Sequence, residues 1–149
     1  MTSSQSPCSP AGLALGFVAG ALSVLVFQMG LGTLLYAAGQ SPNPPYSVTP
    51  VPPLGIPQFL SGAFWGGLWG IGLNALLWQL DARGWRYWLT AILFGGLVVG
   101  GTLLFVVLPL KGRPIAAGWN MHAWALIFCL HAMFGFGTAV WLRVFGARR

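Results

Sequence analysis

The chain has almost no negative charge. Among its 149 residues there is one acidic side chain, Asp81, against seven Lys and Arg, and charged residues make up 5% of the sequence. A soluble domain carries roughly 25% charged residues, so a water-soluble fold of this chain would lack a polar surface. The single carboxylate also lies outside every long apolar run, which argues against membrane-embedded proton relays or cation sites built on carboxylates.

The sequence also lacks the motifs on which hydrolytic and nucleotide-dependent enzymes depend. It contains no HExxH helix, no Ser, His and Asp trio and no glycine-rich phosphate-binding loop. Cys8, in the polar N-terminal tail, and Cys129, inside an apolar run, are too far apart to pair within one chain. We therefore expect a protein that is not an enzyme and that holds no metal or cofactor.

Most of the chain consists of long apolar runs. Hydrophobic residues make up 56% of the sequence, and its mean hydropathy is +0.77. The runs cover residues 12–38, 58–80, 87–110 and 121–142. Each is long enough to cross a ~30 Å hydrocarbon core as a helix, which takes about 20 residues. We predict an all-α membrane protein, a four-transmembrane-helix bundle that forms one integral membrane domain over residues 1–149.

Lys and Arg residues near the ends of the runs predict the orientation, because such residues are retained on the cytoplasmic side. Five cations share a side with the N-terminus and two lie on the other side: Arg83, Arg86, Arg143, Arg148 and Arg149 against Lys111 and Arg113. We predict the inner membrane of the cell, with both termini cytoplasmic. A cleaved signal peptide ending near Ala38 is the alternative, disfavoured because no Lys or Arg precedes Gly12.

The longest break between runs, residues 39–57, contains seven prolines and no charge, which predicts an extended, partly polyproline II strap outside the cytoplasm. Its end, residues 50–58 (PVPPLGIPQ), continues into residues 63–70 (AFWGGLWG), and residues 112–120 (GRPIAAGWN) hold the corresponding place in the second half. These segments resemble a family of small, functionally uncharacterised bacterial inner-membrane proteins with four spans. The resemblance implies topology only, and no catalytic or binding residue is carried over.

Two short matches relate the halves of the chain. Residues 32–36 (GTLLY) match residues 101–105 (GTLLF) at an offset of 69, and residues 69–72 (WGIG) match residues 134–137 (FGFG) at an offset of 65. One interpretation is two tandem helical hairpins that arose by duplication of a two-span unit. The other is chance similarity, since apolar helices are built from few residue types.

Glycines recur at four-residue spacing on three of the runs and so line one face of each helix. They are Gly12, Gly16 and Gly20, then Gly62, Gly66 and Gly70, then Gly96 and Gly100. Such faces let two helix backbones approach closely in lipid. We expect these glycines to pack helices within the bundle, and an interface with a second copy or another protein is the alternative.

Among the polar side chains inside the runs, we single out Gln28, Asn74, Thr102 and His131. Gln28 and His131 fall near the middle of their runs, where an unpaired polar group costs several kcal/mol, so we hypothesise that they hydrogen-bond across the bundle. His122 and His131 are about 13 Å apart along a helix and on opposite faces, so one haem iron cannot take both.

The leading functional hypothesis is an accessory or self-associating structural subunit without enzymatic activity. Its expected partners are the lipid bilayer and either a second copy or another membrane protein, and its net charge of +6 fits anionic headgroups rather than nucleic acid. The alternative is a small dimeric transporter or channel with Gln28, Asn74 and His131 lining a polar midplane path. A third hypothesis, a haem or quinone subunit of a redox complex, rests on His131 and the aromatic residues.

Overall fold

The computed structural model describes residues 6–52 and 54–146, and in these residues four helices are long and apolar enough to cross a membrane. They cover Pro10–Ala37, Gln58–Gln79, Gly84–Leu110 and Met121–Phe145. The predicted all-α fold with four long apolar helices is confirmed, and it is the fold of a multi-pass integral membrane protein.

The helix ends differ most from the predicted runs in two places. The third helix begins at Gly84 rather than Tyr87, and the fourth ends at Phe145 rather than Leu142. Gly84 (φ +56°) and Asp81 (φ +42°) are left-handed, so the chain reverses within the short turn and the third helix starts at once. The hydropathy pattern missed the first turn of the third helix and the last turn of the fourth, because each of them carries an arginine at the level of the headgroups.

The first and third helices are each built from several segments. The first comprises α1 (Pro10–Ser23), the π-helical segment η1 (Val24–Gln28) and α2 (Met29–Ala37). The third comprises α4 (Gly84–Leu93), the π-helical segment η2 (Phe94–Val99), α5 (Gly100–Thr102), the π-helical segment η3 (Leu103–Val107) and α6 (Leu108–Leu110). The second is α3 (Gln58–Gln79), and the fourth, α7 (Met121–Phe145), follows a short 3₁₀ turn, η4 (Ile115–Trp119).

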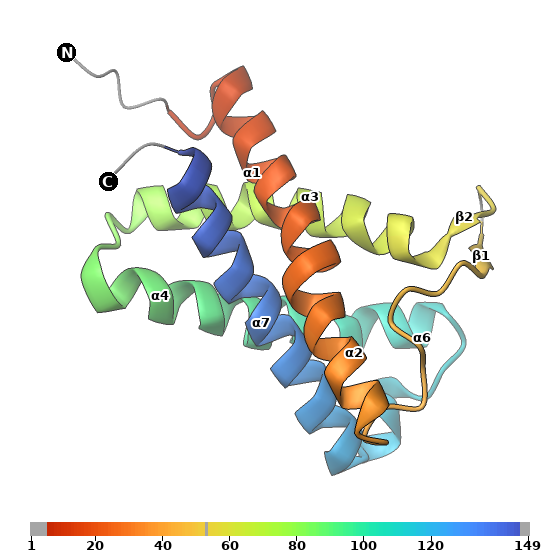
Figure 1. Ribbon diagram of the computed structural model, residues 1–149. Coiled ribbons are helices and arrows are strands. Elements are labelled where there is room, and N and C mark those ends of the chain that lie inside the picture. Colours follow the sequence, from red (N-terminus) through yellow and green to blue (C-terminus); the bar gives the residue numbers. More distant parts are fainter. Residues whose placement is uncertain (1–5, 53, 147–149) are drawn as a thin grey trace.

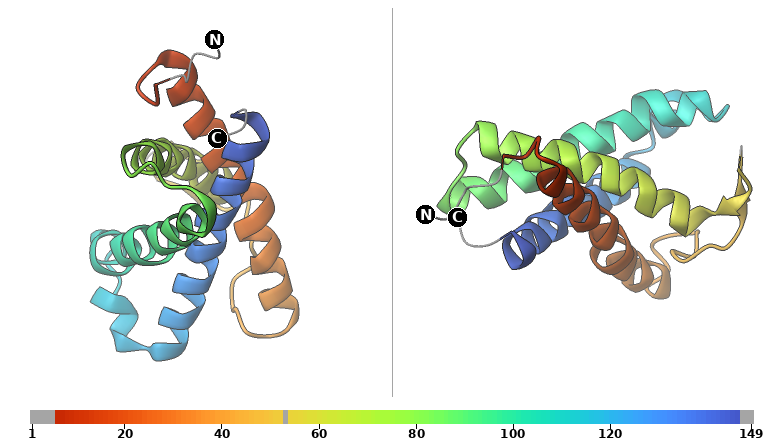
Figure 2. Two further views of the ribbon diagram at one scale, coloured as in Figure 1. Left: turned by 90° about the vertical axis from the view of Figure 1, so that its left-hand side faces the viewer. Right: turned by 90° about the horizontal axis from the view of Figure 1, so that it is seen from above.

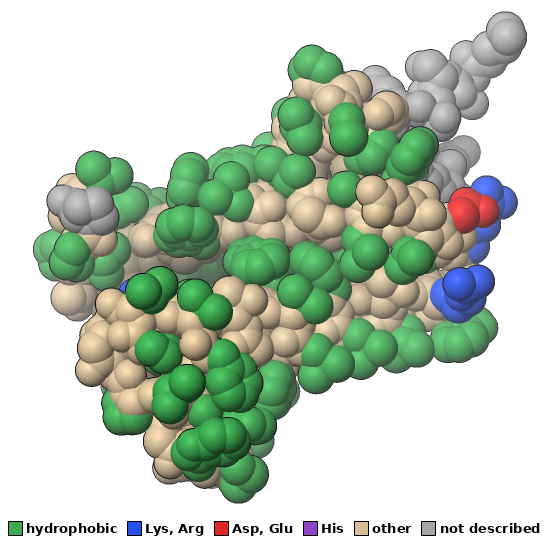
Figure 3. Space-filling model, turned by 180° about the vertical axis from the view of Figure 1, so that it is seen from behind, with side chains coloured by type: hydrophobic (Ala, Val, Ile, Leu, Met, Phe, Trp, Pro, Cys, Tyr) green, Lys and Arg blue, Asp and Glu red, His purple; other side chains and the backbone are tan. Residues whose placement is uncertain are grey.

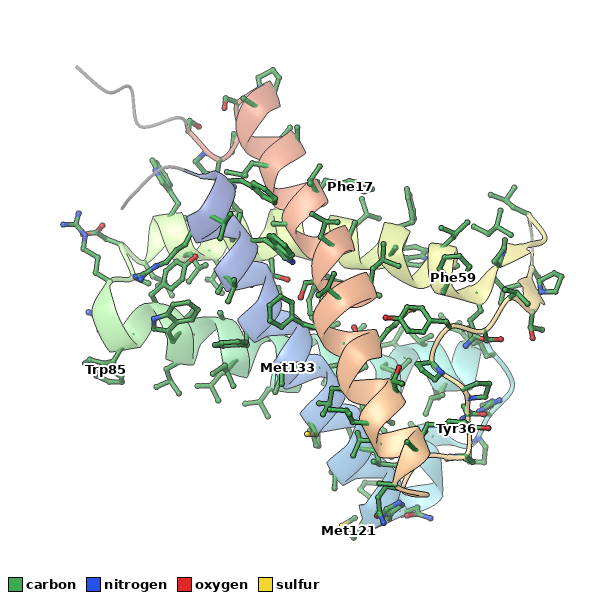
Figure 4. All side chains as sticks on the ribbon, viewed as in Figure 1. Phe17, Tyr36, Phe59, Trp85, Met121 and Met133 are labelled. Carbon is green, nitrogen blue, oxygen red and sulfur yellow. The ribbon has the colours of Figure 1, made fainter. Side chains whose placement is uncertain are left out.

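The helices form two layers. α1 and α7 lie side by side in one layer, and α3 and α4 pack across them at a steep angle in the other (Figures 1 and 2). The start of α1, the turn between α3 and α4 and the end of α7 lie at one end, opposite the loops, as Trp85 and Met121 show in Figure 4. We call the end with the turn between α3 and α4 the arginine end, after Arg83, Arg86 and Arg143, and the opposite end the loop end. Arg148 and Arg149 lie outside the described residues.

Buried side chains form two clusters. The larger lies towards the arginine end and contains Leu73, Leu77, Tyr87, Ala139 and Leu142 among others. The smaller, further along the bundle, is made by Val24, Val99 and Phe134. Both clusters take side chains from three or more helices, so the packing of the bundle depends on all of its long elements.

Where α1 crosses α3, glycines bring the two backbones into contact. A Cβ atom on Gly16 would lie 2.8 Å from Cα of Ile71, and a Cβ on Gly70 would lie 2.7 Å from Cα of Gly20 and collide with the carbonyl oxygen of Gly16. A Cβ on Gly20 would collide with the carbonyl oxygen of Gly66. No side chain larger than hydrogen fits at this crossing without moving a backbone.

The second close crossing uses glycines that the four-residue pattern did not single out. A Cβ on Gly95 would collide with the carbonyl oxygen of His131, and a Cβ on Gly135 with that of Ala91. A Cβ on Gly96, which the pattern named, would make only ordinary contact with α7, at 3.6 Å. The wider turn of η2 changes which residues share a face, so a fixed spacing of four does not identify the contact here.

The remaining glycines of the pattern lie in three different surroundings. A Cβ on Gly12 would lie 2.8 Å from Cα of Pro7, so Gly12 packs against the N-terminal tail rather than another helix. A Cβ on Gly62 would be 3.7 Å from the side chain of Val24, and one on Gly100 would be 3.2 Å from an aromatic ring of α7. Only the α1 and α3 crossing therefore has glycines of the pattern on both helices in backbone contact.

The duplication of a two-helix hairpin stays a prediction, with observations on both sides. Gly70 and Gly135, which correspond in the two sequence matches, both stand at helix crossings. Their partners do not correspond, because Gly20 lies in α1, before η1, whereas Gly95 lies within η2. α1 also packs against both α3 and α7, whereas α4 packs chiefly against α7.

The second part of the proline-rich loop, residues 50–57, does not continue the extended strap that the sequence predicts. It contains an antiparallel pair of short strands, β1 (Pro50–Val51) and β2 (Ile56–Pro57), in which Val51 lies opposite Ile56. Gly55, with φ +66°, supplies the left-handed position that turns the chain between them. The polyproline II expectation is wrong in this part, because backbone pairing across the turn takes the place of an extended path.

Candidate functional site

The polar side chains predicted to lie near the midplane do not form one site. Asn74 is buried in α3, and its Nδ2 donates to the carbonyl oxygen of Gly12 at 3.1 Å, which ties α3 to the beginning of α1. Nδ1 of His131 lies 2.7 Å from the carbonyl oxygen of Ile127, one turn earlier in its own helix, so Nδ1 donates this bond. The bond of Asn74 joins two helices, whereas that of His131 lies within one helix.

Gln28 and His131 are not joined as we hypothesised. Among residues 6–52 and 54–146, the side chain of Gln28 makes no hydrogen bond, and His131 bonds only to its own helix. His131 faces η2 and α5, where its Cβ is 3.6 Å from the position of a Cβ on Gly100. The bond fails because Gln28 belongs to η1 in the first helix, whereas the His131 face of α7 is turned towards the third.

The two histidines have separate environments. Nε2 of His122 lies 3.0 Å from the carbonyl oxygen of Gln40, at the loop end, far along α7 from His131. In the described part of the chain, no group of three or more His, Cys, Asp or Glu side chains is arranged to hold a metal ion. Thr102, the remaining polar residue that the sequence analysis singled out, donates to the carbonyl oxygen of Val98 within its own helix at 2.7 Å.

The polar centre of the bundle involves residues that the sequence did not single out. Oγ of Ser23 donates to the carbonyl oxygen of Phe134 at 2.6 Å, and Oγ1 of Thr138 donates to the same oxygen at 2.8 Å. Both hydroxyls are fully buried. Ser23 thereby links α1 to α7, and the only sequence signal for it is a small polar residue inside an apolar run. In contrast, the indole Nε1 of Trp141 is buried with no acceptor among the described residues.

At the arginine end a cavity of about 120 Å³ opens between all four long helices. Its polar lining consists of Asn74, Arg83, Tyr87 and Arg143, and leucines of α1, α3 and α7 form its apolar walls. We call it the arginine-end cavity. Asn74 is the predicted polar residue that borders it, and in the sequence its cationic lining was visible only as separate arginines near the ends of the runs.

Two contacts fix the position of Arg143 at this cavity. The hydroxyl of Tyr87 donates to the carbonyl oxygen of Ala139 at 2.8 Å, which holds α4 against α7. The guanidinium of Arg143 lies 4.5 Å from the centre of the Tyr87 ring and 5.0 Å from that of Trp88. A cation over two aromatic faces is attracted by their electron-rich π clouds, so the guanidinium is held in place.

A second hollow, of about 260 Å³, lies between α3 and the third helix and is almost wholly apolar. Its lining includes Leu76, Thr90, Leu93 and Phe94. Seen from behind, hydrophobic side chains follow the two helices that border it, and the charged ones gather at the end where these helices join (Figure 3). A hollow with this lining suits lipid chains rather than a polar substrate.

The outer loop is tied to the first helix through η1. In a regular α-helix the N–H of Met29 would donate to the carbonyl oxygen of Leu25, but in η1 it donates to those of Val24 and Val26. The hydroxyl of Tyr46 donates to the carbonyl oxygen of Leu25, to which Met29 does not donate, at 2.7 Å. This bond anchors the loop at the π-helical turn.

The second outer loop has an unusual backbone. Ala116, Ala117 and Trp119 have φ of +53°, +51° and +60°, and Gly118 has +65°, so η4 is a left-handed turn. Nε1 of Trp124 donates to the carbonyl oxygen of Ala116 at 2.7 Å and fixes the turn against α7. Each residue other than glycine costs roughly 1–2 kcal/mol in this conformation, and such strain is often retained at functional surfaces.

Comparisons of the chain with protein-family models, with curated proteins and with solved structures found no match.

Proposed function

We propose that this integral membrane protein is not an enzyme and acts by binding another membrane protein, or a second copy of itself, through the loop end. The observation that supports this most is a set of large apolar side chains on loops outside the lipid-spanning segments. Leu54 is 78% exposed and Trp119 is 62% exposed, and Val48 and Ile115 are exposed as well. Apolar side chains gathered on an ordered surface that lipid chains do not cover are typical of interaction sites.

The loops are held rather than free, which favours recognition over a simple connecting role. Tyr46 bonds to η1, His122 bonds to Gln40, and Trp124 bonds to the strained turn that carries Trp119. A preorganised surface loses less conformational entropy on binding than a flexible one. The polar midplane residues give less support to a transporter, because the arginine-end cavity is bordered by Asn74 and not by Gln28 or His131, and the apolar hollow is bordered by none of the three.

Site-specific photo-crosslinking tests this proposal. A benzophenone amino acid placed at Leu54 or at Trp119 is expected to give discrete protein adducts in native membranes, at twice the mass of the chain if the partner is a second copy. The matched control is Leu97, which is 60% exposed in the middle of η2 and should react with lipid only. Loop positions that give only the monomer, or adducts equally strong from Leu97, would contradict the proposal.

We further propose that the bacterial inner membrane holds the protein with both termini in the cytoplasm and that the glycine faces pack its helices in lipid. The excess of Lys and Arg at the arginine end supports the orientation, and the backbone contacts of Gly16, Gly20, Gly66 and Gly70 support the packing. Membership of the four-span inner-membrane family that the outer segments resemble is part of the same proposal.

The orientation can be tested with the chain's own cysteine. In a Cys129→Ser variant, exposed Cys8 is expected to escape an impermeant maleimide in intact spheroplasts and to react after permeabilisation. The control replaces both cysteines by serine and adds Arg113→Cys at the loop end, which should react without permeabilisation. Ready labelling of Cys8 in intact spheroplasts would reverse the orientation.

A further inference from the structure

The arginine-end cavity has a positive charge that the described residues leave unbalanced. The ion pair of Arg83 and Asp81, at 2.9 Å, is about three-quarters exposed and therefore weak. Arg143 has no carboxylate partner and no hydrogen-bond acceptor among the described residues, although Tyr87 and Trp88 hold its guanidinium in position. The donors of Arg143 are thus fixed in place and free to bind an anion.

The N-terminus of α4, at the cavity, also favours an anion. α4 begins at Gly84, and Arg83 at its N-cap supplies no side-chain acceptor, so the first N–H groups of α4 have no cap. These groups carry a partial positive charge, which favours an anion. The end of α7, at Gly146, carries the opposite partial charge, and Arg143 in the last turn of α7 offsets it.

From the cavity and its two arginines we propose a binding site for the phosphate group of an anionic phospholipid. A volume of about 120 Å³ corresponds to roughly four water molecules, which holds a phosphate group but no acyl chain. Arginine suits this ligand because its planar guanidinium donates two parallel hydrogen bonds to a phosphate. The helix ends place the cavity at the level of the headgroups, and its small volume leaves the acyl chains of the lipid outside it.

The proposal is tested by lipid retention in native mass spectrometry of the full chain. Protein is taken from nanodiscs of phosphatidylcholine mixed with phosphatidylglycerol, and retained lipid is counted for the wild type, Arg83→Gln and Arg143→Gln. Each substitution is expected to lower the apparent affinity for phosphatidylglycerol about fivefold, because each removes one cation near the membrane surface. Retention of phosphatidylcholine should not change.

The matched control is Arg113→Gln, which removes one arginine at the loop end and should leave phosphatidylglycerol retention unchanged. Arg83 is exposed, so its substitution tests the site even if Arg143→Gln fails to fold. Equal retention by the wild type and a folded arginine-end variant would overturn the proposal, as would an equal loss in Arg113→Gln. Release of the lipid by inorganic phosphate, but not by chloride at the same ionic strength, would assign the site to free phosphate and overturn the lipid as its ligand.

Discussion

Replacing Gly70 by alanine is expected to separate α1 from α3 and to destabilise the bundle by about 3 kcal/mol or more. The new Cβ would collide with the carbonyl oxygen of Gly16 and lie 2.7 Å from Cα of Gly20. Both are backbone atoms, so no flexible side chain can move aside and the helices themselves must part. Unfolding of the purified protein by dodecyl sulfate in mixed micelles, followed by circular dichroism, measures the change.

Two glycines of the same chain serve as controls for helix propensity. A Cβ on Gly30 or Gly101 would meet no atom within 4 Å, and both residues lie in helices. Alanine there should leave stability unchanged or raise it by up to about 1 kcal/mol, since alanine is the better helix former. If Gly70→Ala unfolds together with Gly30→Ala and the wild type, the close crossing of α1 and α3 is wrong.

Replacing Phe134 by alanine is expected to cost about 2 kcal/mol or more through the cavity it leaves. Phe134 is 1% exposed and packs with Val24 and Val99 in the smaller core cluster. The removed ring fills roughly 100 Å³, and residual cavities cost about 24 cal/mol per Å³. In a membrane, the hydrophobic transfer of the side chain contributes little to stability, because lipid is as apolar as the core. The loss of stability therefore comes from lost van der Waals contacts. The same dodecyl sulfate titration measures it.

The matched control for this change is Phe64→Ala. Phe64 is 50% exposed on α3, so its loss leaves a gap that lipid can fill, and we expect a change below about 1 kcal/mol. The carbonyl oxygen of Phe134 still accepts from Ser23 and Thr138 in the variant, which separates packing from hydrogen bonding. A loss in Phe64→Ala as large as that in Phe134→Ala would remove Phe134 from the core.

The sequence predicted part of the helix packing. It named Gly16, Gly20, Gly66 and Gly70, which lie where α1 crosses α3, because α1 before η1 and all of α3 are regular helices, in which residues four apart share a face. It named Gly96 and missed Gly95, because the set of residues that faces α7 changes within η2. No residue in the sequence indicates a π-helical turn. The hypothesis that Gln28 pairs with His131 is wrong for a related reason. The position of a residue along its run predicts its depth in the membrane, but it does not predict which helix packs against each face.

The number of long apolar helices and the gathering of arginine at the ends of the helices were determined by the sequence alone, because contiguous hydrophobicity and charge are properties of the chain in order. Tertiary structure alone decided that Ser23 meets Phe134, that Tyr46 reaches Leu25, and that Arg83 and Arg143 line one cavity. Each of these joins residues from different elements. Their distances depend on how the helices cross, and in lipid that is set by close packing and individual hydrogen bonds rather than by hydrophobic pattern.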